Sequence, residues 1–85
     1  MKLTTSKGND YQVDWIDGPT FTTGEVLLQM KDDRRLPEIA AEFDGLEWLK
    51  RESENQGNKS WEGYAVLQMI TKLDDGNVRI VLSKG

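Results

Sequence analysis

The sequence predicts a small α+β domain: a mostly antiparallel sheet, or a partly closed β-barrel, of about five or six strands with one short helix after the third strand. In several short segments apolar side chains alternate with polar ones, which is the period of a half-buried strand. Residues 36–43 instead carry apolar side chains at helical spacing. Short segments rich in Gly, Asn and Asp separate these elements, and such short connections favour antiparallel pairing.

An opening hairpin is expected over residues 2–16. Residues 2–6 are rich in threonine, whose β-branched side chain favours extended backbone. Residues 7–10, Lys-Gly-Asn-Asp, have the composition of a turn. In residues 11–16 apolar and polar side chains then alternate, which indicates a strand with one buried face.

A third strand is expected over Glu25–Lys31. Gly18-Pro19 ends the preceding strand, because proline has no N–H to donate to a ladder. Val26, Leu28 and Met30 then share one face of the next segment. A helix over the same residues is the alternative, since leucine and methionine suit helices as well. The short length and the neighbouring strand-like segments favour a strand.

One short helix is expected over Pro37–Phe43. Proline is favoured in the first helical turn, where its missing N–H has no consequence. Asp44-Gly45 is expected to end the helix, because glycine readily adopts the left-handed conformation of a helix cap. The apolar stripe of the helix consists of Leu36, Ile39, Ala40 and Phe43. A helix of about two turns is unstable alone in water, so the stripe is expected to pack on the sheet.

The C-terminal half predicts the remaining strands. Residues 46–51 have the pattern of a strand, and residues 52–59 form a polar stretch that we expect to be a hairpin loop. Residues 60–73 carry apolar side chains at both parities, which indicates either a central strand covered on both faces or a bulge at Gly63. Asp74–Asn77 is a turn of the Asp-Gly kind, and a final alternating strand follows it.

Composition restricts the chemistry. The 85 residues are enough for one domain, residues 1–85. The chain has no cysteine and no histidine, so disulfides, thiolate metal sites and the common Ser-His and Cys-His arrangements are excluded. We therefore expect a protein that is not an enzyme and that holds no metal and no cofactor.

Charge and apolar patterning restrict the partners. The net charge is −4, from 11 basic and 15 acidic residues, and acidic residues flank the tryptophans. Both features disfavour nucleic acid, for which neutralisation of phosphates supplies most of the affinity. The apolar runs are too short for a membrane-spanning helix, and the N-terminus lacks the apolar segment of a secretory signal. No membrane association and a cytoplasmic location are expected.

Two groups of residues are candidates for contact with a partner protein. The turn Asp32–Arg35 is either a solvated turn with local ion pairs or an electrostatic contact surface. Trp15 and Trp48 are expected in the core, whereas Trp61 opens its strand beside the polar stretch and is the expected interface anchor. The predicted partner-binding residues are Asp32, Asp33, Arg34, Arg35, Trp61 and Tyr64.

The order of these elements resembles a known group of proteins. A short helix ending in Phe43-Asp44-Gly45 precedes a strand, then Trp61–Leu67 with its Gly63-Tyr64 pair, then Asp75–Leu82. This arrangement resembles small structural proteins of the tail or virion region of tailed bacteriophages and prophages. The resemblance covers roughly the C-terminal two-thirds of the chain, and its firm motif is Gly63-Tyr64 with the terminal hairpin. It implies a protein of the bacterial host cytoplasm or of the virion, and it brings no catalytic residues.

The expected function is therefore a non-enzymatic structural or assembly role, carried out through contacts with copies of the chain or with neighbouring subunits. A domain of this size has a small core, so self-association into a homo-oligomer is a natural source of added stability. The alternative is a small phage- or bacterium-encoded binding module that regulates or inhibits a host protein. An enzyme is the least favoured class, because the nucleophile–base pairs that remain without Cys and His are Ser–Lys pairs, which all lie in expected turns or at the end.

Overall fold

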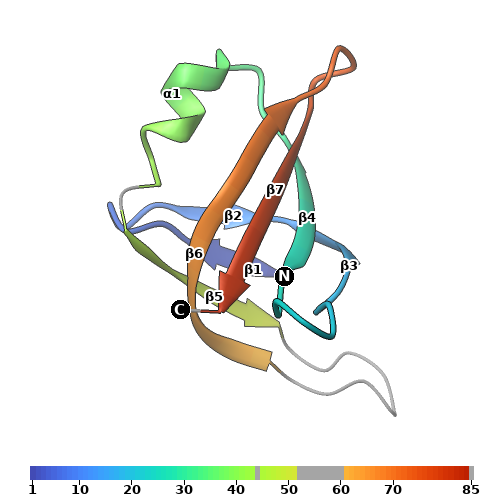
Figure 1. Cartoon of the computed structure of the whole chain (residues 1–85). Coiled ribbons are helices and arrows are strands. Elements are labelled where there is room, and N and C mark those ends of the chain that lie inside the picture. Colours follow the sequence, from blue (N-terminus) through green and yellow to red (C-terminus); the bar gives the residue numbers. More distant parts are fainter. Residues whose placement is uncertain (44, 52–60, 85) are drawn as a thin grey trace.

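The computed structural model describes residues 1–43, 45–51 and 61–84. Within these residues it shows one antiparallel sheet of seven strands and one minor helix, so the sheet dominates the fold (Figure 1). The elements are β1 (Lys2–Thr4), β2 (Asp10–Gln12), β3 (Asp14–Asp17), β4 (Val26–Lys31), α1 (Leu36–Ala40), β5 (Leu46–Arg51), β6 (Trp61–Lys72) and β7 (Asn77–Lys84). The order across the sheet is β2-β1-β5-β6-β7-β4-β3.

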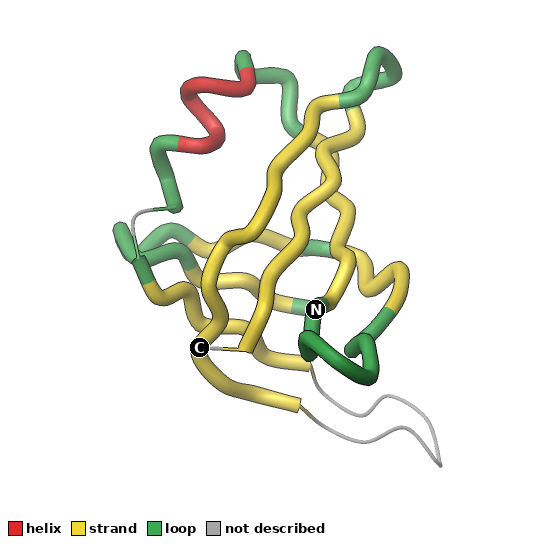
Figure 2. The backbone as a smooth tube through the Cα atoms, in the orientation of Figure 1, coloured by secondary structure: helices red, strands yellow, loops and turns green. Residues whose placement is uncertain are grey.

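The two edge strands of this sheet, β2 and β3, are consecutive in the chain. Only Val13 separates them; its side chain is buried, and its backbone N–H donates a 2.9 Å hydrogen bond to the Met1 carbonyl. One extended segment therefore pairs with β1 through its first half and with β4 through its second half. The sheet curls so that both of its edges reach this segment, as the tube in Figure 2 shows.

This arrangement corrects the expected strand count. The opening hairpin is confirmed by the pairing of β1 with β2, but the single strand expected over residues 11–16 is two strands with different partners. The described residues thus form seven strands rather than five or six, and α1 follows the fourth strand rather than the third. The alternation runs unbroken across the change of partner, because Tyr11, Val13 and Trp15 all contact the same core.

Inward-facing side chains of the strands form one apolar core. The face of β4 predicted from Val26, Leu28 and Met30 is confirmed as buried, which also excludes the helical alternative for this segment. The other buried apolar residues are Leu3, Val13, Ile39, Leu49, Ala65, Val78, Ile80 and Leu82. Glu47 of β5 also points into the interior and is fully buried.

A bulge in β6 explains why both parities of this strand are apolar. Leu67 lies opposite Leu82, but the next paired residue, Met69, lies opposite Val81. The extra residue reverses the alternation, so that Leu67 packs against the core before the bulge and Ile70 does so after it. The bulge is therefore not at Gly63, where the register is regular. Its consequence is that Met69 points outward and is 58% exposed.

The predicted terminal hairpin is confirmed by the pairing of β6 with β7. Leu73 N–H donates to the Asn77 carbonyl at 2.8 Å, and Asn77 N–H donates to Asp75 Oδ1 at 3.0 Å. Gly76 has a φ of 87°, a left-handed conformation that favours glycine. The Asp-Gly turn therefore has the conformation that its residues favour.

Helix α1 is shorter than expected. It ends at Ala40 with Ala41 as its C-cap, so Gly45 lies beyond the helix and does not cap it. Pro37 does stand in the first turn, and Ile39 is the buried residue of the helix, which contacts β6. The expectations for Asp44 and for the polar stretch 52–59 lie outside the described residues.

We expect Ile39→Ala to lower the free energy of unfolding by about 2–4 kcal/mol, because it leaves a cavity between α1 and the sheet. Denaturant unfolding of the whole domain measures this change. Lys7→Ala, on an exposed turn, is the control and should change stability by less than about 0.5 kcal/mol. If Ile39→Ala and Lys7→Ala changed the free energy of unfolding equally, the packing of Ile39 against the sheet would not contribute to stability.

Candidate functional site

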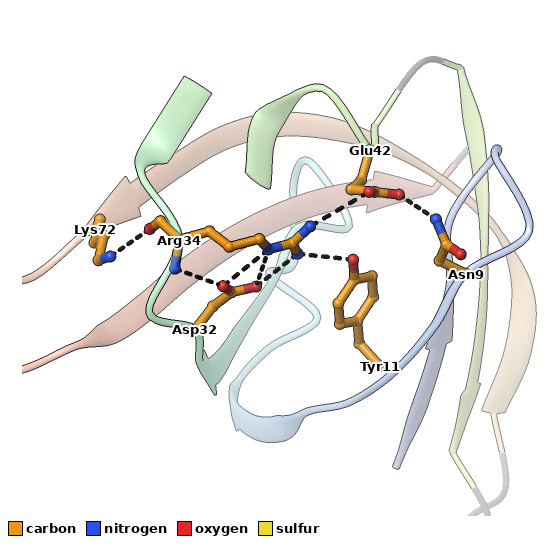
Figure 3. Close-up of polar contacts among 6 residues, drawn as sticks. All are labelled: Asn9, Tyr11, Asp32, Arg34, Glu42 and Lys72. Carbon is orange, nitrogen blue, oxygen red and sulfur yellow. Dashed lines mark hydrogen bonds and ion pairs between the residues drawn. The ribbon is translucent and has the colours of Figure 1, made fainter. Parts of the chain in front are cut away.

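The charged turn after β4 is built around Arg34 (Figure 3). Its guanidinium binds the Asp32 carboxylate in two places, with Nε 3.0 Å from Oδ1 and Nη2 2.7 Å from Oδ2. Nη2 also donates to the Tyr11 hydroxyl at 2.8 Å, and Nη1 donates to Glu42 Oε1 at 3.4 Å. The Arg34 carbonyl in turn accepts a hydrogen bond from the Lys72 ammonium. We call these five residues the Arg34 network.

The Arg34 network ties together segments that are distant in the sequence. Tyr11 belongs to β2, Lys72 ends β6, and Glu42 follows α1 and also accepts a hydrogen bond from Asn9 of the first turn. The side chain of Asp32 is only 10% exposed. Hydrogen bonds from Arg34 hold the pKa of the Asp32 carboxyl below its usual range, and the same contact raises the pKa of Arg34. The network therefore holds the segment around α1 against the sheet.

The four residues of the predicted charged turn, Asp32–Arg35, have two different environments. Asp32 and Arg34 make the local ion pairs that were one interpretation of the sequence. Asp33 and Arg35 are both exposed, and Arg35 Nε lies 3.9 Å from Glu38 Oε1 as a surface pair. A partner contact at this turn stays a prediction. It would have to use Asp33 and Arg35, because the other two side chains are held within the fold.

A second feature lies on the outer face of the sheet, which the core does not cover. Leu46 lies opposite Val66, and Trp48 lies opposite Tyr64, in the pairing of β5 with β6. The rings of Trp48 and Tyr64 meet edge to face with centroids 4.9 Å apart, a favourable geometry for an aromatic pair. Tyr64 is 55% exposed and Leu46 is 50% exposed.

The apolar surface continues across the next strands. Met69 of β6 lies opposite Val81 of β7, which lies opposite Leu27 of β4. Met69 is exposed because of the bulge, and the other two side chains are partly exposed. We call this surface the outer band; its residues are Leu27, Leu46, Trp48, Tyr64, Val66, Met69 and Val81. The exposed Gln68–Ser83 hydrogen-bonded pair lies between Val66 and Met69, so the band consists of two apolar groups on one face. Exposed apolar side chains gathered on one face are a common feature of interaction sites.

One end of the outer band is hollowed into a groove. The groove has a volume of about 420 Å³, and its apolar lining includes Leu27, Met69 and Val81. Its charged lining is contributed by Asp17, Glu25 and Arg79. A volume of this size is typical of a site that receives a ligand or a protruding side chain.

The predicted partner residues are not brought together. Tyr64, near the start of β6, belongs to the outer band, whereas the Arg34 network contacts Lys72 at the other end of that strand. The side chain of Trp61 lies outside the described residues. Trp48, which was expected in the core, lies on the outer face instead. Its neighbours Glu47 and Leu49 point into the interior, whereas its half-buried ring meets Tyr64.

Sequence reasoning missed most of the outer band. The signal was present in β6, where both parities are apolar, and in the pairs Leu27-Leu28 and Val81-Leu82. A second apolar parity means either a second covering layer or an exposed apolar face. In this fold α1 covers little of the sheet, so the second parity is exposed.

The described residues contain no group of three or more potential metal-ligating side chains. None of their helices has the length and apolar character needed to cross a membrane. Comparison with family models, curated proteins and solved structures finds no match for this chain. The resemblance to phage structural proteins therefore stays a prediction.

We expect Arg34→Ala to lower the free energy of unfolding by about 1–3 kcal/mol, because the nearly buried Asp32 carboxylate loses its guanidinium donors and keeps only the backbone N–H of residue 34. Arg35→Ala is the matched control, since Arg35 is 82% exposed and its surface ion pair contributes at most about 1 kcal/mol. Denaturant unfolding at pH 7 compares the two variants. A loss for Arg35→Ala that equals the loss for Arg34→Ala would contradict the role given to the network.

Stability should also depend on the ionisation of Asp32. The pKa of the Asp32 carboxyl is lower in the folded state than in the unfolded state. The ionised carboxylate therefore adds to the free energy of unfolding above about pH 4, and this stabilisation is lost as pH falls through the folded pKa. The difference in unfolding free energy between wild type and Asp32→Asn should therefore shrink as pH falls from 7 to about 2. Urea unfolding over a series of pH values measures this, and a difference independent of pH would refute it.

Proposed function

We propose that this chain is a non-enzymatic structural or assembly protein that acts through protein–protein contacts at its outer band. The observation that carries the proposal is the row of exposed apolar side chains on adjacent strands, with Leu46, Tyr64 and Met69 each half exposed or more. Leaving so much apolar surface in water forgoes roughly 25 cal/mol per Å², which burial against a partner would recover. The chain's charge and its acidic flanks favour a protein partner over nucleic acid.

The resemblance to tail and virion proteins of phages suggests an assembly as the setting of this contact. In that setting the chain would meet neighbouring subunits or copies of itself, in the bacterial cytoplasm before assembly or in the virion after it. A band that spans several strands suits such a contact, because strands hold the side chains in a fixed arrangement. The Arg34 network supports this indirectly, since it holds the fold together at the end of β6 away from Tyr64.

A regulatory binding module is the second candidate, and the groove favours it. An apolar hollow with a few charged groups at its sides is the usual form of a site for a protruding group of another molecule. The two candidates share the outer band and differ in the partner. Identification of the bound protein therefore separates them.

Photo-crosslinking in the native host tests the use of the outer band. A benzophenone amino acid in place of Tyr64 should give adducts heavier than the single chain, because this ring points outward from the band. The same group in place of Lys7, on an exposed turn outside the band, is the control and should give about tenfold less adduct. Equal yields at both positions, or no adduct at Tyr64, would contradict the proposal.

A further inference from the structure

An exposed aromatic side chain belongs to a segment that also lines the groove. Phe21 is fully exposed, and it belongs to the segment between β3 and β4. Three other residues of this segment, Gly18, Thr20 and Glu25, line the groove. The groove and an aromatic knob are therefore offered by the same region of the molecule.

The segment that carries Phe21 is held by hydrogen bonds. Thr20 N–H donates to the Glu25 carbonyl at 2.9 Å, and Gly24 N–H donates to the Thr20 carbonyl at 3.1 Å. The Thr20 hydroxyl lies 2.6 Å from that of Thr23 and accepts from Glu25 N–H at 3.0 Å. At Gly18, whose φ is 104°, an added Cβ would lie 2.5 Å from the Glu25 carbonyl oxygen, so the two ends of the segment are in close contact. The backbone that carries Phe21 is thus held at both of its ends, which lowers the backbone entropy lost on binding.

The charges of the groove are separated along its length. Asp17 lies opposite Leu27 at the end that carries the Phe21 segment. Arg79 lies opposite Gln29 and Thr71, further along the strands toward the β6–β7 turn. Among the described residues the Arg79 guanidinium donates to Gln29 Oε1 at 3.3 Å and pairs with no carboxylate. Among the charged residues that line the groove, the two acidic ones therefore lie at the end that carries the Phe21 segment, and Arg79 lies at the other end. Outside the lining, Asp14 lies opposite Gln29 at the level of Arg79, and Lys84 lies beside Gly24.

We infer that the occupant of the groove is a second copy of this chain, related by a two-fold axis; the inference rests on the function proposed above. An isologous contact places each end of the groove against the opposite end in the partner copy. Phe21 of each copy then enters the groove of the other copy near Thr71 and Arg79. Arg79 of each copy meets Asp17 and Glu25 of the other.

The complementarity favours a second copy over an unrelated protein. A surface that carries a protruding side chain, a groove and charges of both signs can be complementary to a second copy of itself rotated by a half turn. Each contact is then made twice. Phe21 also approaches the Arg79 guanidinium of the other copy, where a cation–π contact is favourable. The groove lies across four strands, β6, β7, β4 and β3, which at about 4.8 Å spacing span only roughly 14 Å, so the contact is expected to be small for a specific interface. The dimer is therefore expected to dissociate on dilution.

Charge reversal on one side of the groove should break the dimer. Sedimentation equilibrium of the wild-type chain should show a monomer–dimer equilibrium. Arg79→Glu should weaken it about tenfold or more, because the new carboxylate would face Asp17 and Glu25 of the other copy. Lys7→Glu is the matched control, since it changes the net charge by the same amount at an exposed turn outside the groove, and it should leave the equilibrium within about twofold.

The decisive experiment mixes two variants. The double variant Asp17→Lys/Glu25→Lys should also be monomeric when alone, because the two new ammonium groups then face Arg79. An equimolar mixture with Arg79→Glu should restore a one-to-one heterodimer, because both contacts of the heterodimer then join opposite charges. Native mass spectrometry distinguishes the two chains by mass, and circular dichroism checks that each variant is folded. A mixture that stays monomeric would overturn the inference.

Phe21→Ser tests the knob separately. The side chain is fully exposed, so this substitution should leave the thermal unfolding midpoint unchanged and weaken the dimer about tenfold or more. If the wild-type chain is monomeric up to about 1 mM and Tyr64 forms adducts with a different protein, the dimer inference is refuted and the proposed function is not. If the chain is monomeric and Tyr64 forms no adduct, both the dimer inference and the proposed function are refuted.

Discussion

The fold depends on a constraint of chain connectivity: a single extended segment, Asp10–Asp17, supplies both edges of the sheet. The segment changes partner at Val13, whose N–H turns to the Met1 carbonyl and whose side chain enters the core. Because two edges that are consecutive in the chain must lie close in space, the sheet has to curl. Curling gives it one enclosed face, and that face holds the whole apolar core. It also leaves the edges very short, which protects them from uncontrolled strand addition.

The same constraint explains the exposed outer face. A curled sheet encloses its inner face without a second layer, so the outer face has no structural need of a cover. Helix α1 spans only Leu36–Ala40 and uses Ile39 to pack at one end of β6. Apolar side chains on the outside are then unnecessary for folding. Their presence on β5, β6, β7 and β4 is what the proposed contact with another molecule would explain.

The two charged features of the molecule have different roles. The Arg34 network is internal: its guanidinium is shared among Asp32, Glu42 and Tyr11, so it joins the segments around α1 to the sheet. The charges of the groove are not combined within the chain, because Asp17 and Arg79 stand at different levels of the sheet. Charges that are paired within a fold stabilise it, whereas separated charges at the sides of an apolar hollow are available to a partner.

Local chemistry by itself determined most of the elements. The alternation in β4, the Asp-Gly turn before β7 and the proline at the start of α1 act over a few residues, so they can be recognised without knowing the fold. What only the tertiary structure decided is the pairing of distant segments: the change of partner at Val13, the bulge that turns Met69 outward, and the meeting of Arg34 with Tyr11 and Glu42. These depend on register and on closure of the sheet, which are long-range properties that no short window of sequence contains. The outer band and its groove could not be located from the sequence for this reason, because the two apolar parities of β6 were equally compatible with a bulge or with a strand covered on both faces.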